Sequence, residues 1–216
     1  MFPRALEICR PGQRHGETAG EGVVSVPRRG TVSGFSLLEL MIVLAISVSI
    51  AAFAIPSFLS AYYNIRLKAA CNDLSSLLQR ARIQSARQNA IYTVTYQIIG
   101  GVQQACIDLD NSGTCDAGEP VIAFNQSIIM APGAPATPYV LVGDTAGTTF
   151  TNTTTLGYSQ RGLPCAYAGG LCTTPAPGYF VYYLQDRRPG TVGWGAVVVS
   201  RSGRTKSVIW DGAAWE

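Results

Sequence analysis

The chain has 216 residues, of which 47% are hydrophobic and only 13% are charged. This length suits one domain with an appended segment rather than two full domains. The formal net charge is +3, and residues 1–34 hold five arginines and three glutamates, which leaves eleven basic and ten acidic residues in the remainder. A remainder so close to neutral excludes a strong general attraction to nucleic acid, although a local basic patch is compatible with it.

The first predicted element is an apolar helix over residues 35–55, which contain a single charged residue. At about 1.5 Å per residue, a helix of this length spans about 31 Å, the thickness of one hydrocarbon core. Arg28 and Arg29 precede it and no basic residue follows before Arg66, so we expect the C-terminal bulk outside the cytoplasm. A cleavable secretory signal would need a small-residue cleavage site after the apolar run. Residues 55–58 read IPSF, so we expect the segment to remain in the membrane.

Glu39 is the one carboxylate in this segment. A charge inside an apolar span is costly unless it is paired, neutralised or close to the interface. Glu39 lies four residues after Phe35, so one interpretation is that it simply reaches the headgroups. The other is that it pairs with a cation of a neighbouring subunit. A new α-amino group at Phe35 would be such a cation, and the pair would be stronger in lipid than in water.

Residues 34–40 read GFSLLEL, and they follow the basic sequence RRG of residues 28–30. This motif resembles the class III signal of type IV pilins and pseudopilins. The resemblance implies cleavage after Gly34 by a prepilin peptidase and methylation of the Phe35 amine. It also implies that Glu39 attracts the N-terminus of an adjacent subunit during assembly.

The same resemblance implies a domain organisation and a location. Residues 1–34 would be a discarded leader, long for this class, and would remove Cys9 from the mature protein. Residues 35–56 would form the transmembrane and assembly helix, which Pro56 bends by removing one hydrogen bond. The protein would be a single-pass protein of the bacterial inner membrane with a periplasmic head, and it would then enter a filament. Its partners would be other pilins or pseudopilins and the inner-membrane assembly platform.

Residues 57–90 are predicted to form an amphipathic helix with one apolar stripe, because apolar residues recur at steps of three and four. Cys71 belongs to this stripe, so we expect it buried and free. Basic residues lie between, and they form either a solvated face or a contact with phosphates of lipid or nucleic acid. The stripe consists of Leu67, Ala70, Cys71, Leu74, Leu77, Leu78 and Ala81, and the basic residues are Arg66, Lys68, Arg80, Arg82 and Arg87.

Residues 91–216 are predicted to form a β-rich head, because the apolar period changes to two and turn residues separate the runs. We therefore expect an α+β protein, with a long N-terminal helix packed on an antiparallel β-sandwich-like head; the resemblance implies the pilin fold. Residues 131–155, rich in Ala, Pro, Gly and Thr, are expected to form a surface loop or a weak edge hairpin. The predicted strands are residues 92–96, 121–124, 179–183, 196–199 and 206–210.

Four cysteines form two local pairs, Cys106 with Cys115 and Cys165 with Cys172, each within a glycine-rich stretch. Neither pair has the spacing of a zinc site or of a thioredoxin-like motif. We interpret them as disulfides in an oxidising compartment such as the periplasm. Reduced thiols in the cytosol are the alternative.

Residues 108–119 have the ligand spacing of a calcium-binding loop. Oxygen atoms at this spacing can converge on a hard cation, and the glycine permits a sharp turn. A polar hairpin tip closed by a disulfide accounts for the same residues without an ion. Loop positions 1, 3, 5, 6, 9 and 12 are Asp108, Asp110, Ser112, Gly113, Asp116 and Glu119.

Arg201, Arg204 and Lys206 surround a predicted turn between the last two strands. Cations on such a turn can contact a phosphate backbone without reading sequence. The segment resembles the G-R-x-R element of FimT-type minor pilins, which implies DNA binding during uptake, with Lys206 in place of the usual arginine. A tip kept soluble by its charges is the alternative. Arg187 and Arg188 are candidate additions to this patch.

Enzymatic activity is not expected, because the single histidine, His15, lies in the predicted leader and no nucleotide-binding loop is present. The first functional hypothesis is a FimT-type minor pilin that primes a type IV pilus and contacts DNA. The alternative is an H-type minor pseudopilin of a type II secretion system. A calcium-regulated, adhesin-like binding module is a third hypothesis.

Overall fold

The computed structural model describes residues 34–138, 149–173, 178–188 and 192–216. The predicted leader up to residue 33, and part of the stretch expected to be a surface loop, lie outside these residues. The chain divides into two compact units, Met1–Ile46 and Ser47–Glu216.

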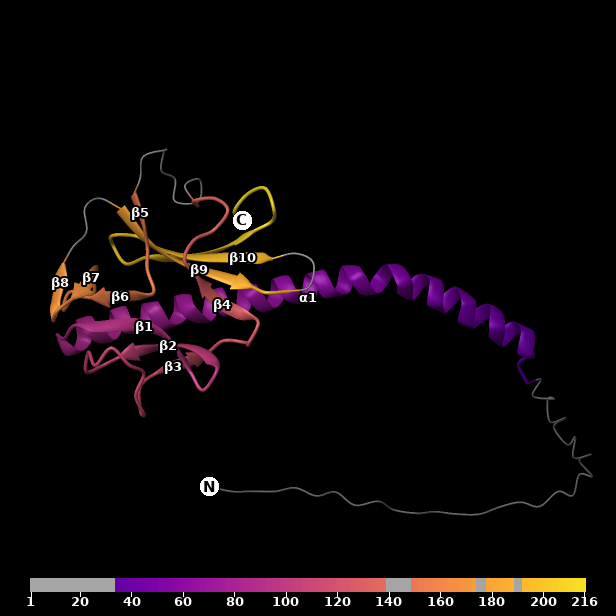
Figure 1. Cartoon of the computed structure of the whole chain (residues 1–216), viewed down its shortest axis with the longest axis horizontal. Helices are drawn as coiled ribbons and strands as arrows, with labels where there is room; N and C mark the ends of the chain where they lie inside the picture. Colours follow the sequence, from indigo (N-terminus) through magenta and orange to yellow (C-terminus); the bar gives the residue numbers. More distant parts are fainter. Residues whose placement is uncertain (1–33, 139–148, 174–177, 189–191) are drawn as a thin grey trace, which may run out of the picture. The chain divides into compact units, whose positions relative to one another are not determined.

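One helix, α1 (Leu37–Gln88), includes both of the helical segments that the sequence predicts (Figure 1). Its described part in the first unit has only exposed side chains. In the second unit the helix runs through Pro56, which has no N–H to donate to the carbonyl of the preceding turn. The helix ends at Gln88. The next residue, Asn89, has a left-handed φ of 50°, and the Ala90 amide donates to the Ser85 carbonyl. This is the cap that usually requires glycine or asparagine.

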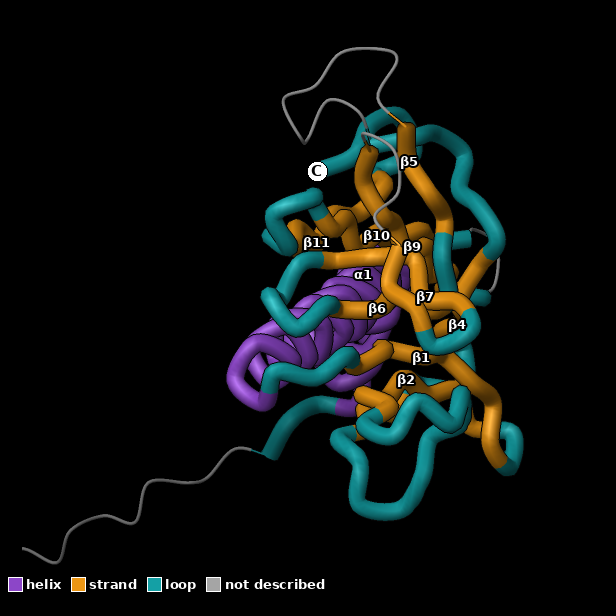
Figure 2. The backbone as a smooth tube through the Cα atoms, turned by 90° about the vertical axis from the view of Figure 1, so that its left-hand side faces the viewer, coloured by secondary structure: helices purple, strands orange, loops and turns teal. Residues whose placement is uncertain are grey.

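The described residues of the head form two sheets, and Figure 2 shows strands of both beside α1. The first sheet has the order β3-β2-β1-β6-β7-β8, and the second has the order β11-β10-β9-β4, with β5 also paired to β9. The strands of the first sheet are β1 (Tyr92–Ile99), β2 (Val102–Asp108), β3 (Val121–Ala123), β6 (Thr155–Tyr158), β7 (Pro164–Ala168) and β8 (Leu171–Thr173). Those of the second are β4 (Ile128–Ala131), β5 (Thr149–Asn152), β9 (Gly178–Asp186), β10 (Gly193–Val199) and β11 (Thr205–Trp210).

The α+β class is confirmed, with a long helix on largely antiparallel sheets, but two details of the expectation were wrong. β5 pairs with β9 in parallel, so the head is not purely antiparallel. β5 also lies within the stretch expected to be a loop or a weak hairpin. The sequence of β5, TFTN, has too little apolar alternation to predict a strand. This strand forms because it pairs with a partner that is distant in the sequence.

The predicted helical stripe forms the centre of the core. All seven of its residues are buried, and they pack against residues of both sheets, among them Val94 and Val197. β10 approaches the helix so closely that a Cβ at Gly195 would lie 2.5 Å from the Cys71 sulfur. Cys71 is free and buried as expected, and burial raises the pKa of its thiol to about 12.

The second sheet is covered on both faces, which explains the continuous apolar runs of β9 and β10. In β9, Tyr182 and Leu184 face the helix, whereas Val181 and Tyr183 join a second cluster with Trp215. Alternate residues of a strand point to opposite faces, so both sets can be apolar only where both faces are covered.

Candidate functional site

The N-terminal part of α1 is a candidate surface for membrane insertion and assembly. Its most apolar 18-residue window has a mean hydropathy of 2.5 and no buried residue, so a helix of this length and composition can cross a membrane once. Glu39 lies in the first turn, where the helix dipole favours a negative charge. Within the described residues its exposed carboxylate has no ion pair or hydrogen bond. Phe35, just before the helix, is 81% exposed.

A second candidate lies where two tight turns meet the C-terminal part of α1 through Arg82. The Arg82 Nε donates to the Gly162 carbonyl at 3.1 Å, and its Nη1 donates to the Gly203 carbonyl at 3.3 Å. Both glycines have positive φ, 70° and 77°, and a Cβ at Gly203 would lie 2.8 Å from the Arg82 Nε. Arg82 therefore fixes both turns to the helix, and the expectation that it belongs to a solvated outer face was wrong.

Six exposed basic residues lie on these turns and on the adjacent helix face, and we call them, with Arg82, the basic end. Arg82, Arg87 and Arg161 line a shared hollow of about 320 Å³. The acidic loop after β2 leaves the sheet at the same end, because Thr93 of β1 pairs with both Asp108 and Gly157, and the strand β1 lies between this loop and the β6–β7 turn. No acidic residue occurs in residues 76–88, 158–163 or 199–207. The six exposed residues are Arg80, Arg87, Arg161, Arg201, Arg204 and Lys206.

Arg187 and Arg188 do not belong to the basic end, so grouping them with it was wrong. They follow β9, whose last residue, Asp186, pairs with Gly193 at the start of β10. The turn with Arg201 and Arg204 follows the opposite end of β10. Six steps along a strand at about 3.3 Å each separate the two ends by about 20 Å. Arg161 belongs to the basic end instead, although its sequence context did not assign it to the patch; the turn-forming glycine after it was the available signal.

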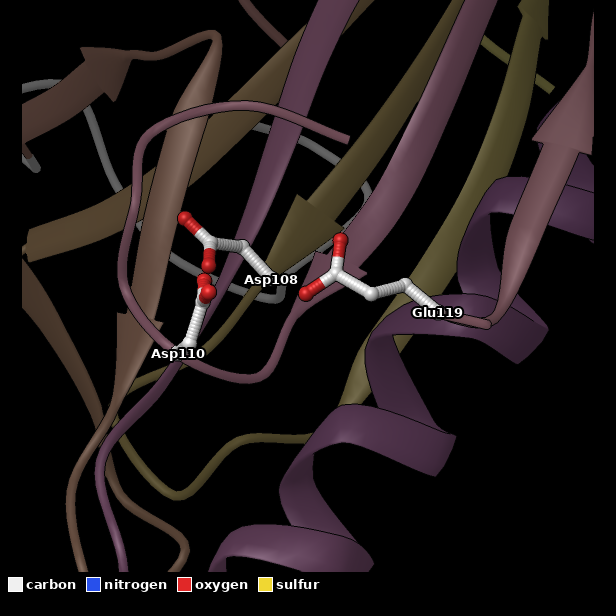
Figure 3. Close-up of side chains that lie close together, drawn as sticks. All are labelled: Asp108, Asp110 and Glu119. Atoms are coloured by element: carbon white, nitrogen blue, oxygen red, sulfur yellow. The ribbon is translucent and has the colours of Figure 1, made fainter. Parts of the chain in front are cut away.

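The predicted calcium loop brings three of its five expected ligands together (Figure 3). Asp108, Asp110 and Glu119 each offer one oxygen, and these atoms lie within 4.8 Å of one another. Asp116 lies outside this group and accepts a hydrogen bond from the Ser112 hydroxyl at 2.9 Å. The arrangement can accept a hard divalent cation, whose preferred ligands are such oxygens.

Backbone donors already satisfy these carboxylates in part. The Asp108 carboxylate accepts from the amides of Ser112 at 3.1 Å and Gly113 at 2.8 Å, and the Glu119 carboxylate accepts from the amides of Leu109 and Asp116. Burial raises the pKa of Asp108, and the hydrogen bond with Asp110 adds to the effect. The hairpin-tip interpretation therefore also has structural support.

Comparisons with protein-family models, curated proteins and solved structures find no match. The functional assignment therefore depends on the residues of this chain.

Both predicted disulfides are present. Cys106–Cys115 joins β2 to the acidic loop, and Cys165–Cys172 joins β7 to β8. Each closes a short loop and limits the conformations of the unfolded chain. Their role is to hold the acidic loop and the β7–β8 hairpin in place.

Proposed function

We propose that this chain is a minor pilin of a type IV pilus, anchored in the inner membrane and assembled through its N-terminal helix. The observation that supports it is the carboxylate of Glu39 in the first turn of α1, the one charged residue in the apolar part of the helix before Arg66. That turn directly follows the Gly34–Phe35 peptide bond of the pilin-like motif. The C-terminal part of the same helix forms the core of the head, so a head would be carried on each assembling helix.

Cleavage after Gly34 would give Phe35 a free amine, and Glu39 of an incoming subunit would attract the amine of its neighbour. Apolar helices gain little from leaving lipid for one another, because lipid tails are equally apolar. An ammonium–carboxylate pair is stronger in a medium of low dielectric constant, so it can select the partner and fix the axial position of the helix.

N-terminal mass analysis of the protein extracted from membranes tests this function. We expect a chain that begins with methylated Phe35. A protein that keeps residues 1–34 in assembled filaments, or that begins after Pro56 as a soluble species, would contradict the proposal.

We further propose that the basic end binds DNA through its phosphates. Six of its seven cations are exposed, and the seven come from three separate segments that contain no acidic residue. Contacts of this kind are independent of base sequence and weaken as salt displaces them. DNA binding favours a pilus that takes up DNA over a secretion pseudopilus.

Gel-shift titrations of Arg204→Ala and Arg161→Ala test the DNA-binding role. We expect each variant to weaken binding severalfold for any DNA sequence and to reduce the salt dependence by about one phosphate contact. Arg187→Ala removes the same charge from the opposite end of β10 and is expected to bind like the parent. Equal affinities for all four proteins would exclude the basic end as the DNA site.

The alternative, an H-type minor pseudopilin of a type II secretion system, would use the same helix with different partners. A chain whose deletion abolishes protein secretion and leaves DNA uptake intact would favour it.

A further inference from the structure

The β1–β2 hairpin ends in an exposed apolar tip that the proposed function does not use. Gly100 and Gly101 form its turn, with φ values of 59° and 80°. Ile98, Ile99 and Val102 beside the turn are 60%, 45% and 37% exposed. Apolar side chains grouped on a tip are costly in water and typically mark a contact surface.

This tip lies at the end of the head from which α1 extends toward its N-terminus. The Phe124 amide donates to the Gln103 carbonyl of β2 at 2.7 Å, and three residues later the Ser127 hydroxyl donates to the Asp186 carboxylate at 2.7 Å. Asp186 is fully buried and forms an ion pair with Arg66 of α1 at 2.9 Å. The chain from β3 through Phe124 therefore runs from the basic end toward Arg66. The hairpin tip lies at the same end of the head as Arg66.

Two arginines accompany the tip. The Arg187 amide donates to the Ser127 carbonyl at 2.8 Å, and the Arg187 side chain is exposed. The Met130 amide of β4 donates to the Tyr96 hydroxyl of β1 at 3.5 Å, and β4 pairs with β9 up to Asp186, so Arg187, the next residue, lies on the hairpin side of the second sheet. The Arg188 Nη1 donates to the Asn64 side chain of α1 at 2.9 Å.

The helix segment below these residues is suited to a membrane interface. Residues 47–65, the part of the second unit before Arg66, contain no charged residue, and as a helix they span about 28 Å, close to the roughly 30 Å of a hydrocarbon core. The segment ends with Tyr62 and Tyr63, which lie 5.8 Å and 5.2 Å from the Arg66 guanidinium. Tyrosines followed by arginine are typical of the headgroup layer. Insertion of this helix segment into a membrane would bring this end of the head to the depth of the lipid headgroups.

We propose that the β1–β2 tip and Arg187 contact the phospholipid headgroup layer and hold the head against the membrane before assembly. The tip supplies apolar area for insertion, and Arg187 supplies a cation for lipid phosphate. This inference rests on the membrane anchoring in the proposed function. Asp211 and Glu216, exposed at and after the end of β11, would be repelled by anionic lipid, so the contact is confined to the hairpin side.

Fluorescence quenching of the full chain in single-copy nanodiscs of phosphatidylglycerol and phosphatidylcholine tests this contact. Ile98→Cys carries an environment-sensitive fluorophore, and the quencher is a nitroxide on the lipid headgroup. Cys71 is buried and stays unlabelled, and Cys9→Ser removes the other cysteine that lies outside the two disulfides. The matched control is Ile83→Cys on α1, because Ile83 is 57% exposed and lies about 26 Å along the helix from Arg66.

We expect the label at 98 to be quenched severalfold more than the label at 83. Adding Arg187→Ala to Ile98→Cys should reduce this quenching, and adding Arg161→Ala should not. Equal quenching at 98 and 83 in chains that have entered the discs overturns this inference alone. A label at 98 that stays unquenched in single-copy discs and changes its emission only in discs with two copies assigns the tip to a second subunit and also overturns it. A chain that does not enter the discs overturns the membrane anchoring as well.

Discussion

Arg80 and Arg82 lie two residues apart on α1 and have different surroundings. Arg80 is exposed, whereas Arg82 is half-buried and donates to the carbonyls of Gly162 and Gly203. Hydrogen bonds from a charged donor to buried acceptors contribute more than neutral ones. One side chain therefore joins the helix to two turns that are distant in the sequence.

Arg82→Ala should lower the free energy of unfolding by about 2 kcal/mol, because both carbonyls lose a charged donor. Arg80→Ala removes the same charge from the exposed face and should change the stability by less than about 0.5 kcal/mol. Urea unfolding of the two variants measures the difference. Equal stabilities would mean that solvent replaces Arg82 at both carbonyls.

At the scale of elements, the acidic loop combines two properties. Its carboxylates accept backbone hydrogen bonds, as in a hairpin tip, and three of them converge, as in a cation site. Asn111 and Gly113 have positive φ, 59° and 81°, which lets the backbone curl around the Asp108 carboxylate. The hairpin-tip and calcium-site interpretations therefore lead to the same loop conformation. A measurement of calcium binding distinguishes them.

We expect calcium to stabilise the head. At about 100 times its Kd, the ion adds about 2.7 kcal/mol, which raises the Tm by roughly 5–10 °C. Asp110→Ala should abolish the shift, and Asp116→Ala, outside the cluster, should retain it. Because the pKa of Asp108 is raised, protons compete with calcium for this carboxylate at a higher pH than for an ordinary aspartate. The calcium-induced rise in Tm should therefore shrink as the pH falls through the pKa of Asp108. An unchanged parental Tm in calcium would leave the loop as a disulfide-closed tip and remove the adhesin-like hypothesis.

At the scale of the whole molecule, two parts of α1 have opposite relations to water. The apolar surface that begins α1 remains exposed, whereas the stripe from Leu67 to Ala81 is buried in the head. An exposed apolar helix is stable only in lipid or among similar helices. The proposed life cycle, first in the membrane and then in a filament, provides both environments.

Glu39→Gln should leave the protein in the membrane and reduce its amount in sheared filaments by about tenfold, corresponding to about 1.4 kcal/mol per subunit. The reason is that glutamine cannot form the charge pair with a neighbouring amine. Glu216→Gln makes the same substitution at an exposed position of the head and should assemble normally. Immunoblots of sheared and membrane fractions measure both. Parental amounts of Glu39→Gln in filaments would show that this carboxylate is not needed for assembly.

The sequence by itself determined the features that depend on neighbouring residues. The apolar span, the buried stripe from Leu67 to Ala81 and the two disulfides of short separation follow from composition and period. Each of the five predicted strands overlaps an observed strand. These observed strands are β1, β3, β9, β10 and β11. Local propensity and burial agree in these segments, so periodicity is sufficient to find them.

Only the tertiary structure decided which distant residues meet. The parallel pairing of β5 with β9, the exclusion of Arg187 from the basic end and the inclusion of Arg82 and Arg161 all depend on strand order and register. A turn carries a basic residue to one end of a sheet or to the other according to the length and direction of the strands before it. Those lengths and directions are fixed when the sheets pack on α1, because the buried stripe can be covered only by strands from separate parts of the chain.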